Sequence, residues 1–253
     1  MKLCQENGLV YYRFDLFENF PGLNHGITTR FGGVSPQGLN LSFGAHDLEV
    51  NVQANLDLAS ETIGFNRLFF AKQVHGDQSL VIKAGGCLGN ERQGGAVNGY
   101  DALITSDRGL GLVVMLADCQ GVALFDPVKE VVAVVHNGWR GSVANILGQT
   151  VSRLKTDFNV RPEDLMVGIS PSLGPCCAEF VNYARELPQE FWKYQTRDHH
   201  FDFWSVSKDQ LMAVGVRSEN IEISGICTVC DDIFYSYRRE KAASRFGLIA
   251  GLV

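Results

Sequence analysis

The sequence predicts a layered α/β (α+β) fold, a mixed β-sheet with flanking helices, from three observations. Three apolar stretches rich in Val, Leu and Ile follow one another at 101–107, 111–126 and 130–139, a pattern typical of buried strands. Apolar residues at helical spacing come directly after them. Strands and helices alternate along the chain, which favours parallel strands, but the turn at Asp126-Pro127 predicts an antiparallel hairpin. The sheet is therefore expected to be mixed.

The other elements follow from local patterns. Segment 65–76 (FNRLFFAKQVHG) predicts a strand that ends at His75, and the glycine-rich stretch 84–100 predicts a long surface loop. Val143, Ile146, Leu147, Val151 and Leu154 predict a helix. A second helix is predicted over Ser207–Val214 with Ser205 or Ser207 as N-cap, and strands are predicted at 221–228 and 246–253.

Composition limits the class of protein. A chain of 253 residues with 45% hydrophobic and 20% charged residues can bury one large core, so residues 1–253 are expected to form a single domain. The net charge of −6 and the lack of a basic stripe argue against a nucleic-acid partner. No apolar run reaches bilayer length, and residues 1–10 do not form a signal peptide, so a cytoplasmic location is expected.

The 7 cysteines also indicate the cytoplasm, because an odd number leaves one thiol over from any full pairing. Cys176 and Cys177 are adjacent, and Cys227 and Cys230 form a Cys-x-x-Cys pair. A vicinal pair suits a zinc ribbon badly, so these four are interpreted as buried structural thiols, with a local disulfide or redox role as the alternative.

A metal site is predicted at the hairpin. If the turn is centred on Pro127 and Val128, Cys119 and His136 lie directly opposite each other. Opposed residues on antiparallel strands have Cβ atoms about 4.5–5.5 Å apart on the same face. A slip of one residue would separate them, so the prediction depends on the register.

His75 completes a set of two imidazoles and one thiolate, which is the ligand set of an open catalytic zinc site. Zinc would lower the pKa of a bound water molecule. Taken singly, each residue also has an interpretation without a metal. A cysteine in a strand is usually a small buried apolar residue, and a histidine beside glycine is usually only hydrogen-bonded.

Several motifs occur in an order that resembles one known family. They are TTRFGGVS (28–35), LNLS (39–42), KQVHG (72–76), ADC (117–119), HNGWRG (136–141), GPCC (174–177) and the segment 227–239 with CTVCDD and YSYRR. Together they resemble the YfiH/YlmD family, also called the laccase-domain or polyphenol oxidase family, over nearly the whole chain.

The resemblance implies a CNF1/YfiH-like fold and a zinc site on His75, Cys119 and His136. It further implies phosphorolysis of adenosine, inosine, guanosine or methylthioadenosine, together with adenosine deamination. Some members are instead assigned to peptidoglycan editing. The chain departs from the family pattern at Gly121, Asn55-Leu56 and Ser244-Arg245. None of these is a predicted ligand, so they bear on substrate preference.

Phosphorolysis needs a phosphate site. The HNGWRG motif runs into a predicted helix, whose N-terminus favours an anion, and Arg140 and Arg30 are the candidate phosphate- or substrate-binding residues. A surface ion pair is the alternative for each arginine. Deamination also needs a group that carries a proton. Asp118 neighbours Cys119, but on an extended strand its side chain would point to the other face, so it is interpreted as a supporting or structural carboxylate.

Three rival functions are compatible with the sequence. With 6 histidines and no His-x-His pair, a full multicopper centre is implausible, although Cu²⁺ could replace Zn²⁺ at one site and give laccase-like oxidase activity. A peptidoglycan-precursor hydrolase could use the same zinc, or Cys119 as nucleophile. The third hypothesis is a non-catalytic zinc-containing binding module.

Overall fold

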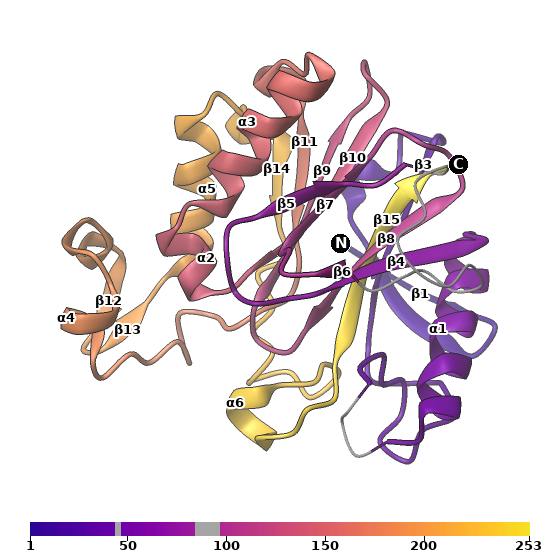
Figure 1. Ribbon diagram of the computed structural model, residues 1–253. Helices are drawn as coiled ribbons and strands as arrows, with labels where there is room; N and C mark the ends of the chain where they lie inside the picture. The colour runs from indigo at the N-terminus through magenta and orange to yellow at the C-terminus, as the bar shows by residue number, and fades with distance from the viewer. Residues whose placement is uncertain (44–46, 84–96) are drawn as a thin grey trace.

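Two β-sheets pack face to face in the computed structural model, which describes residues 1–43, 47–83 and 97–253 (Figure 1). In sheet order, the first sheet consists of β1 (Lys2–Glu6), β2 (Leu9–Arg13), β3 (Leu23–Thr28), β15 (Phe246–Leu252), β8 (Leu110–Leu116), β4 (Arg67–Lys72) and β6 (Val97–Asn98). The second consists of β14 (Ile221–Ile223), β11 (Met166–Ile169), β9 (Gln120–Asp126), β10 (Val131–Asn137), β7 (Ala102–Thr105) and β5 (Ser79–Val81).

Each sheet is mixed, as predicted. β4 is parallel to β8 and β6, and β11 and β5 each have one parallel neighbour, whereas the other pairs are antiparallel. The number of sheets differs from the prediction. The apolar stretch 111–126 divides into β8 in one sheet and β9 in the other, and residues 117–119 carry the chain between them.

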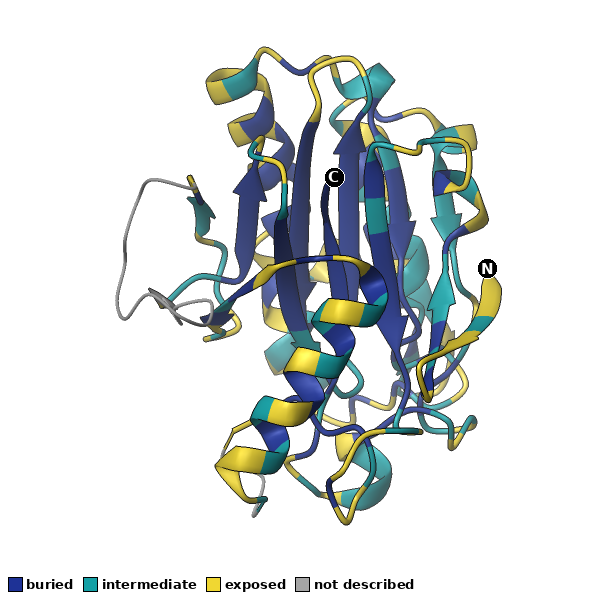
Figure 2. Ribbon diagram, turned by 90° about the vertical axis from the view of Figure 1, so that its right-hand side faces the viewer, coloured by how far each residue is buried: buried dark blue, intermediate teal, exposed yellow. Residues whose placement is uncertain are grey.

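Helices cover the outer faces of both sheets, so the layers run helix, sheet, sheet, helix (Figure 1). α1 (Glu49–Ile63) lies on the first sheet, and α3 (Ile146–Phe158) and α5 (Phe203–Ala213) lie on the second. The alternation along β8 shows why: Leu112 and Val114 enter the core between the sheets, while Val113 packs under α1. The central strands are therefore buried on both faces (Figure 2).

The remaining elements are short. The hairpin β12 (Gln195–Arg197)–β13 (His200–Phe201) and α4 (Tyr183–Glu186) project from the body (Figure 1). The other helices are α2 (Trp139–Val143) and α6 (Tyr237–Glu240), with 3-10 helices at Asp15–Phe17, Pro162–Asp164, Gln189–Tyr194 and Ser218–Asn220. No helix in the described ranges is long and apolar enough to cross a bilayer.

Several predicted boundaries are wrong for identifiable reasons. β4 ends at Lys72, and His75 lies beyond it in a left-handed conformation with φ of +60°. The helix predicted from Val143 begins at Ile146, because Asn145 caps it and separates it from α2. The helix predicted over 207–214 begins at Phe203, because Asp202 accepts hydrogen bonds from the N–H groups of the first turn.

Two further differences concern the N-terminal half. α1 has no counterpart among the predicted elements, although Val52, Leu56, Ala59 and Ile63 recur at helical spacing. The predicted loop 84–100 lies mostly outside the described residues, and its end forms the short strand β6.

Candidate functional site

His75, Cys119 and His136 come together where the chain passes between the two sheets. Their ligating atoms all lie within 4.8 Å of one another, and the two imidazole rings meet edge to face. The predicted register was wrong by two residues: His136 pairs with Gly121, and the turn is centred on Val128 and Lys129. A shift by an even number keeps a residue on the same face of the sheet, and Cys119, directly before β9, still lies close to His136.

Asp101, which the sequence did not single out, bonds the imidazole of His136 and the backbone of His75. It is buried directly before β7, and its Oδ1 lies 2.8 Å from Nδ1 of His136. The same carboxylate accepts hydrogen bonds from the backbone N–H groups of Val74, His75 and Gly76 at 3.1, 3.0 and 2.8 Å. These bonds stabilise the left-handed turn at His75, a conformation that costs about 1 kcal/mol or more for a non-glycine residue.

Asp101 also fixes the tautomer of His136. Burial disfavours ionisation of Asp101, but the hydrogen bonds from His136 and the backbone outweigh it and lower the pKa of the carboxyl. An ionised carboxylate can only accept, so Nδ1 of His136 carries the proton. Nε2 is therefore the nitrogen available to a metal, which is the usual arrangement of a histidine ligand with a carboxylate behind it.

Cys119, which is partly buried, and His136, which is buried, each stabilise the charged form of the other. Burial opposes the charge on Cys119, but the charge of His136 and hydrogen bonds from both imidazoles lower the pKa of the thiol to about 6. Burial likewise opposes the charge on His136, but Cys119 and Asp101 raise the pKa of the imidazole to about 9. The thiol is thus held as the thiolate that a metal requires.

The donor set fits one tetrahedral zinc ion with an open position. Bonds of about 2.0–2.3 Å to nitrogen and sulfur hold ligand atoms roughly 3.3–3.8 Å apart, which agrees with the upper limit of 4.8 Å in this cluster. Gly138 keeps the space next to the cluster free. A Cβ at this position would lie 3.1 Å from both Sγ of Cys119 and Cδ2 of His75.

The cluster lines a cavity of about 1110 Å³. Aromatic side chains provide much of the apolar wall: Phe43, Phe70, Trp139, Phe180, Phe203 and Tyr237. Basic side chains also line it: Lys72, Arg238, Lys241 and Arg245. A cavity with apolar walls and a few convergent polar groups is the usual form of a small-molecule site.

Comparison with known proteins decides the family. The family described as multi-copper polyphenol oxidoreductase laccase matches residues 24–253. The chain belongs to this family. Its resemblance to the YfiH/YlmD group and the expected fold class are confirmed by similar proteins and solved structures.

Curated relatives and a solved structure are similar to this chain over most of its length. A protein of Geobacillus stearothermophilus named purine nucleoside phosphorylase YlmD is 31% identical, over 89% of this chain and 88% of its own length. The human protein named purine nucleoside phosphorylase LACC1 is 28% identical over 90% of this chain, which spans 55% of it. The crystal structure of YfiH from Bacillus licheniformis superposes with a TM-score of 0.86, at 26% identity, covering 98% of this chain and 97% of that one.

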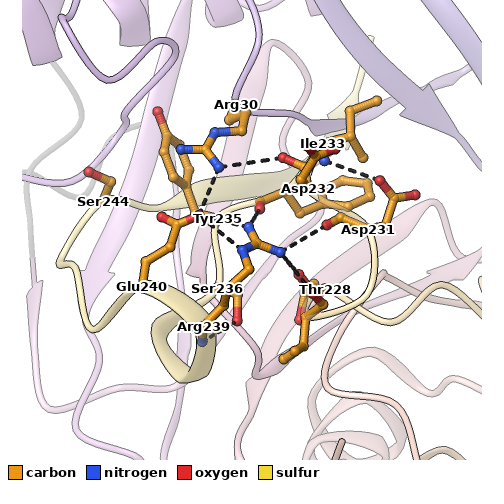
Figure 3. Close-up of polar contacts among 12 residues, drawn as sticks. Arg30, Thr228, Asp231, Asp232, Ile233, Tyr235, Ser236, Arg239, Glu240 and Ser244 are labelled. Carbon is orange, nitrogen blue, oxygen red and sulfur yellow. Dashed lines mark hydrogen bonds and ion pairs between the residues drawn. The ribbon is translucent and has the colours of Figure 1, made fainter. Parts of the chain in front are cut away.

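The two arginines predicted to bind phosphate lie elsewhere. Arg140 is exposed and stacks on the Trp139 ring. Arg30 forms a 2.7 Å ion pair with Glu240 and lies over the ring of Tyr235 (Figure 3). Neither is among the described residues that line the cavity.

Arg245 is electrostatically coupled to Cys119, one of the candidate metal ligands. It lines the cavity, and its guanidinium donates to the carbonyls of Ala242 and Ser244. Burial lowers the pKa of Arg245, while negative charge at Cys119 and Asp118 favours its charged form. The sequence marks Ser244-Arg245 only as a departure from the family pattern.

Asp118 has the structural role that was expected, for a different reason. Its backbone is left-handed, with φ of +84°, instead of extended. Its carboxylate accepts a 2.7 Å hydrogen bond from the hydroxyl of Thr228 and a 2.6 Å bond from the backbone N–H of Arg238. These bonds attach the segment that carries Cys119 to the C-terminal wall of the cavity.

Proposed function

We propose that this chain is a metal-dependent purine nucleoside phosphorylase whose metal, zinc by preference, is held by His75, Cys119 and His136. The observation that carries the proposal is the placement of these three ligands in the wall of a cavity that also presents aromatic rings and Arg245. Relatives that align over 89% of this chain are named purine nucleoside phosphorylases, which supports the same activity here.

The cavity supplies what phosphorolysis requires from the protein. A phosphate oxygen forms a bond to the anomeric carbon of the ribose, the bond from that carbon to the purine nitrogen breaks, and the base leaves with the electron pair and takes up a proton. Arg245, supported by Lys241, can bind and orient the phosphate, since a guanidinium matches phosphate oxygens with two parallel hydrogen bonds. Phe70 and Trp139 offer apolar ring faces for the purine.

A divalent metal held by His75, Cys119 and His136 would supply a Lewis acid and would lower the pKa of a water molecule. That chemistry also suits adenosine deamination, in which water adds to the carbon that carries the amine and ammonia leaves. We therefore assign both reactions to the same cavity. The chain's own residues orient the ligands, through Asp101, and exclude bulk solvent from the buried imidazole of His136.

A multinuclear copper oxidase is less well supported. Within the described ranges, His75, Cys119 and His136 are the one group of close potential ligands that contains an imidazole. His25 is buried elsewhere and accepts a hydrogen bond from the backbone of Phe14. A three-copper cluster needs many more imidazoles in one place, so oxidase activity would require a single copper at the zinc position.

The test is a substrate screen on protein whose metal content has been measured. Adenosine, inosine, guanosine and methylthioadenosine are incubated with and without phosphate, and the products are separated by chromatography. We expect phosphate-dependent release of the free base, which Cys119→Ala abolishes. Absence of turnover by metal-replete protein would reject the assignment and favour a hydrolase acting on cell-wall precursors.

A further inference from the structure

A second group of potential metal ligands lies outside the cavity. The sulfurs of Cys176, Cys177, Cys227 and Cys230 all lie within 4.8 Å of one another. The prediction that all four are buried was wrong: Cys227 is buried, Cys177 is partly buried, and the other two are exposed. We propose that these four thiols bind one thiophilic divalent ion, zinc by preference, in a tetrathiolate site.

The spacing of the sulfurs favours a metal over a disulfide. Cys230 Sγ lies 3.5 Å from the sulfurs of both Cys176 and Cys177. Four thiolates around zinc, each about 2.3 Å from the ion, have sulfurs roughly 3.8 Å apart. A disulfide joins two sulfurs at about 2.05 Å and would leave the other two unpaired. Because Cys230 lies at the same distance from both thiols, the arrangement fits a shared metal ion better than a disulfide to either one.

The backbone explains how adjacent cysteines point to the same place. On a strand, Cys176 and Cys177 would project to opposite faces, but residues 175–177 form a turn closed by a 2.9 Å hydrogen bond from the N–H of Cys177 to the carbonyl of Gly174. Gly174 also allows close approach of the two loops, because a Cβ there would lie 2.9 Å from the Cβ of Cys227.

Backbone N–H groups are directed at the buried sulfur. Gly174 donates to Sγ of Cys227 at 3.3 Å, and the N–H groups of Val229 and Cys230 also hydrogen-bond this sulfur. A turn in which a Cys-x-x-Cys segment folds its own N–H groups onto the first sulfur favours a thiolate there. Hydrogen bonds of this kind orient the ligands of metal sites and offset their negative charge.

Arg239 also holds this loop, through hydrogen bonds to its backbone (Figure 3). Its guanidinium donates to the backbone carbonyls of Thr228, Val229, Asp231 and Phe234. The Cys-x-x-Cys turn is therefore fixed in shape by groups that are not themselves ligands. The charge of Arg239 is paired with Glu240 at 2.7 Å, so Arg239 acts on this loop through its hydrogen bonds to the backbone.

The cluster joins two segments that form walls of the cavity. Ser172 and Cys227 pair as a parallel β-bridge. The segment that follows Ser172 contributes Phe180 to one wall of the cavity, and the segment that follows Cys227 contributes Arg238 and Arg245 to the other. Thr228, within the Cys-x-x-Cys turn, hydrogen-bonds Asp118 beside Cys119. A metal here would hold both walls in register with the candidate catalytic centre, as a structural site does.

The chemistry of the ligands selects the ion. Four thiolates favour Zn²⁺ or Fe²⁺ over Mg²⁺, Ca²⁺ or Mn²⁺, which prefer oxygen. The two thiophilic ions are distinguished in the test, since an iron tetrathiolate absorbs visible light when oxidised and a zinc site does not.

The first experiment measures metal content by mass spectrometry on protein purified in reductant without chelator. Because Cys119→Ala removes the other candidate centre, we expect this variant to retain about one zinc per chain. Cys119→Ala combined with Cys176→Ser or with Cys230→Ser should retain no zinc. Cys119→Ala combined with Cys4→Ser, a change on strand β1, is the control and should retain as much zinc as Cys119→Ala alone. Both tested cysteines are exposed, so the serine variants should fold; circular dichroism checks this.

X-ray absorption on the Cys119→Ala protein gives a readout that is independent of mutation within the four-cysteine cluster. Four sulfur neighbours at about 2.3 Å would support the site. A mixed nitrogen and sulfur shell, unchanged metal content in the serine variants, or an intact mass that shows a disulfide in metal-free protein would each overturn it. Because Cys119→Ala has no candidate catalytic metal, these results do not depend on nucleoside turnover.

Discussion

The carboxylate of Asp101 couples the two histidines of the candidate centre. One oxygen, Oδ1, lies 2.8 Å from Nδ1 of His136 and accepts the backbone N–H of His75 at 3.0 Å. The side chain of one ligand and the backbone of the other are therefore positioned by the same atom. This makes Asp101 a positioning residue whose replacement should disturb both ligands at once.

Asp101→Asn should weaken metal binding roughly 10- to 100-fold, because the amide loses one acceptor and places N–H groups against donors. The variant should also unfold at a lower temperature, since three backbone N–H groups bond to this buried side chain. Metal affinity is measured by competition with a chromophoric chelator. Asp77→Asn, in the same loop, is the matched control; an equal loss in both variants would contradict the assigned role.

The pKa shifts predict an unusually reactive thiol in metal-free protein. A thiol whose pKa is lowered to about 6 remains a thiolate at neutral pH and becomes protonated only as the pH falls through that value. Alkylation of Cys119 by iodoacetamide should therefore show a midpoint near pH 6, whereas free cysteine has its midpoint at about 8.5. Peptide mass spectrometry follows the rate at each pH. Adding one equivalent of zinc should protect the residue.

Asp101→Asn provides a check on the same pair. Asp101 contributes to raising the pKa of His136, so its loss should lower that pKa below about 9. A weaker imidazolium stabilises the thiolate less, and the alkylation midpoint of Cys119 should rise. An unchanged midpoint would show that Asp101 does not act through His136.

Much of the fold follows from hydrophobic patterning. The strands β7, β10 and β15 coincide with apolar runs, because burial on both faces leaves no polar alternation. The division of 111–126 between two sheets was not predictable in the same way. It depends on the left-handed turn at Asp118, and that turn is stabilised by Thr228, 110 residues further along the chain.

The candidate ligands could be predicted, whereas their supports could not. Cys119 and His136 do not lie directly opposite each other, but the register differs by an even number of residues, and their side chains still come together. Asp101 gives one local signal, an acid immediately before a fully buried strand. The four-cysteine cluster gives none beyond residue type, since it depends on the parallel bridge between Ser172 and Cys227.

Gly138→Ala should separate metal binding from folding. The added methyl would lie 3.1 Å from Sγ of Cys119 and from Cδ2 of His75, so it crowds the ligands, and the backbone here is one that alanine adopts without strain. We expect weaker zinc binding, by about tenfold or more, with a melting temperature of metal-free protein close to that of the parent. Gly22→Ala, where the nearest atom is 3.9 Å away, is the control.

Arg245→Gln tests the phosphate site of the proposed phosphorylase. Arg245 lines the cavity and is influenced by the charges at Cys119 and Asp118, unlike the exposed Arg140, which stacks on Trp139. A hydrogen bond to a charged group contributes about 1.5–3 kcal/mol, so kcat/KM for phosphate should fall roughly 10- to 100-fold.

Most of the fall in kcat/KM should come from a higher KM for phosphate, because Arg245 is assigned to binding the anion. The zinc content should stay unchanged. Arg140→Ala should leave both constants close to those of the parent, whereas the phosphate site first predicted from the sequence would require a loss there. Steady-state kinetics with phosphate varied at saturating inosine decides between the two arginines. If Arg245→Gln alters kcat alone, the residue acts on the leaving base or the metal ligands instead of on phosphate.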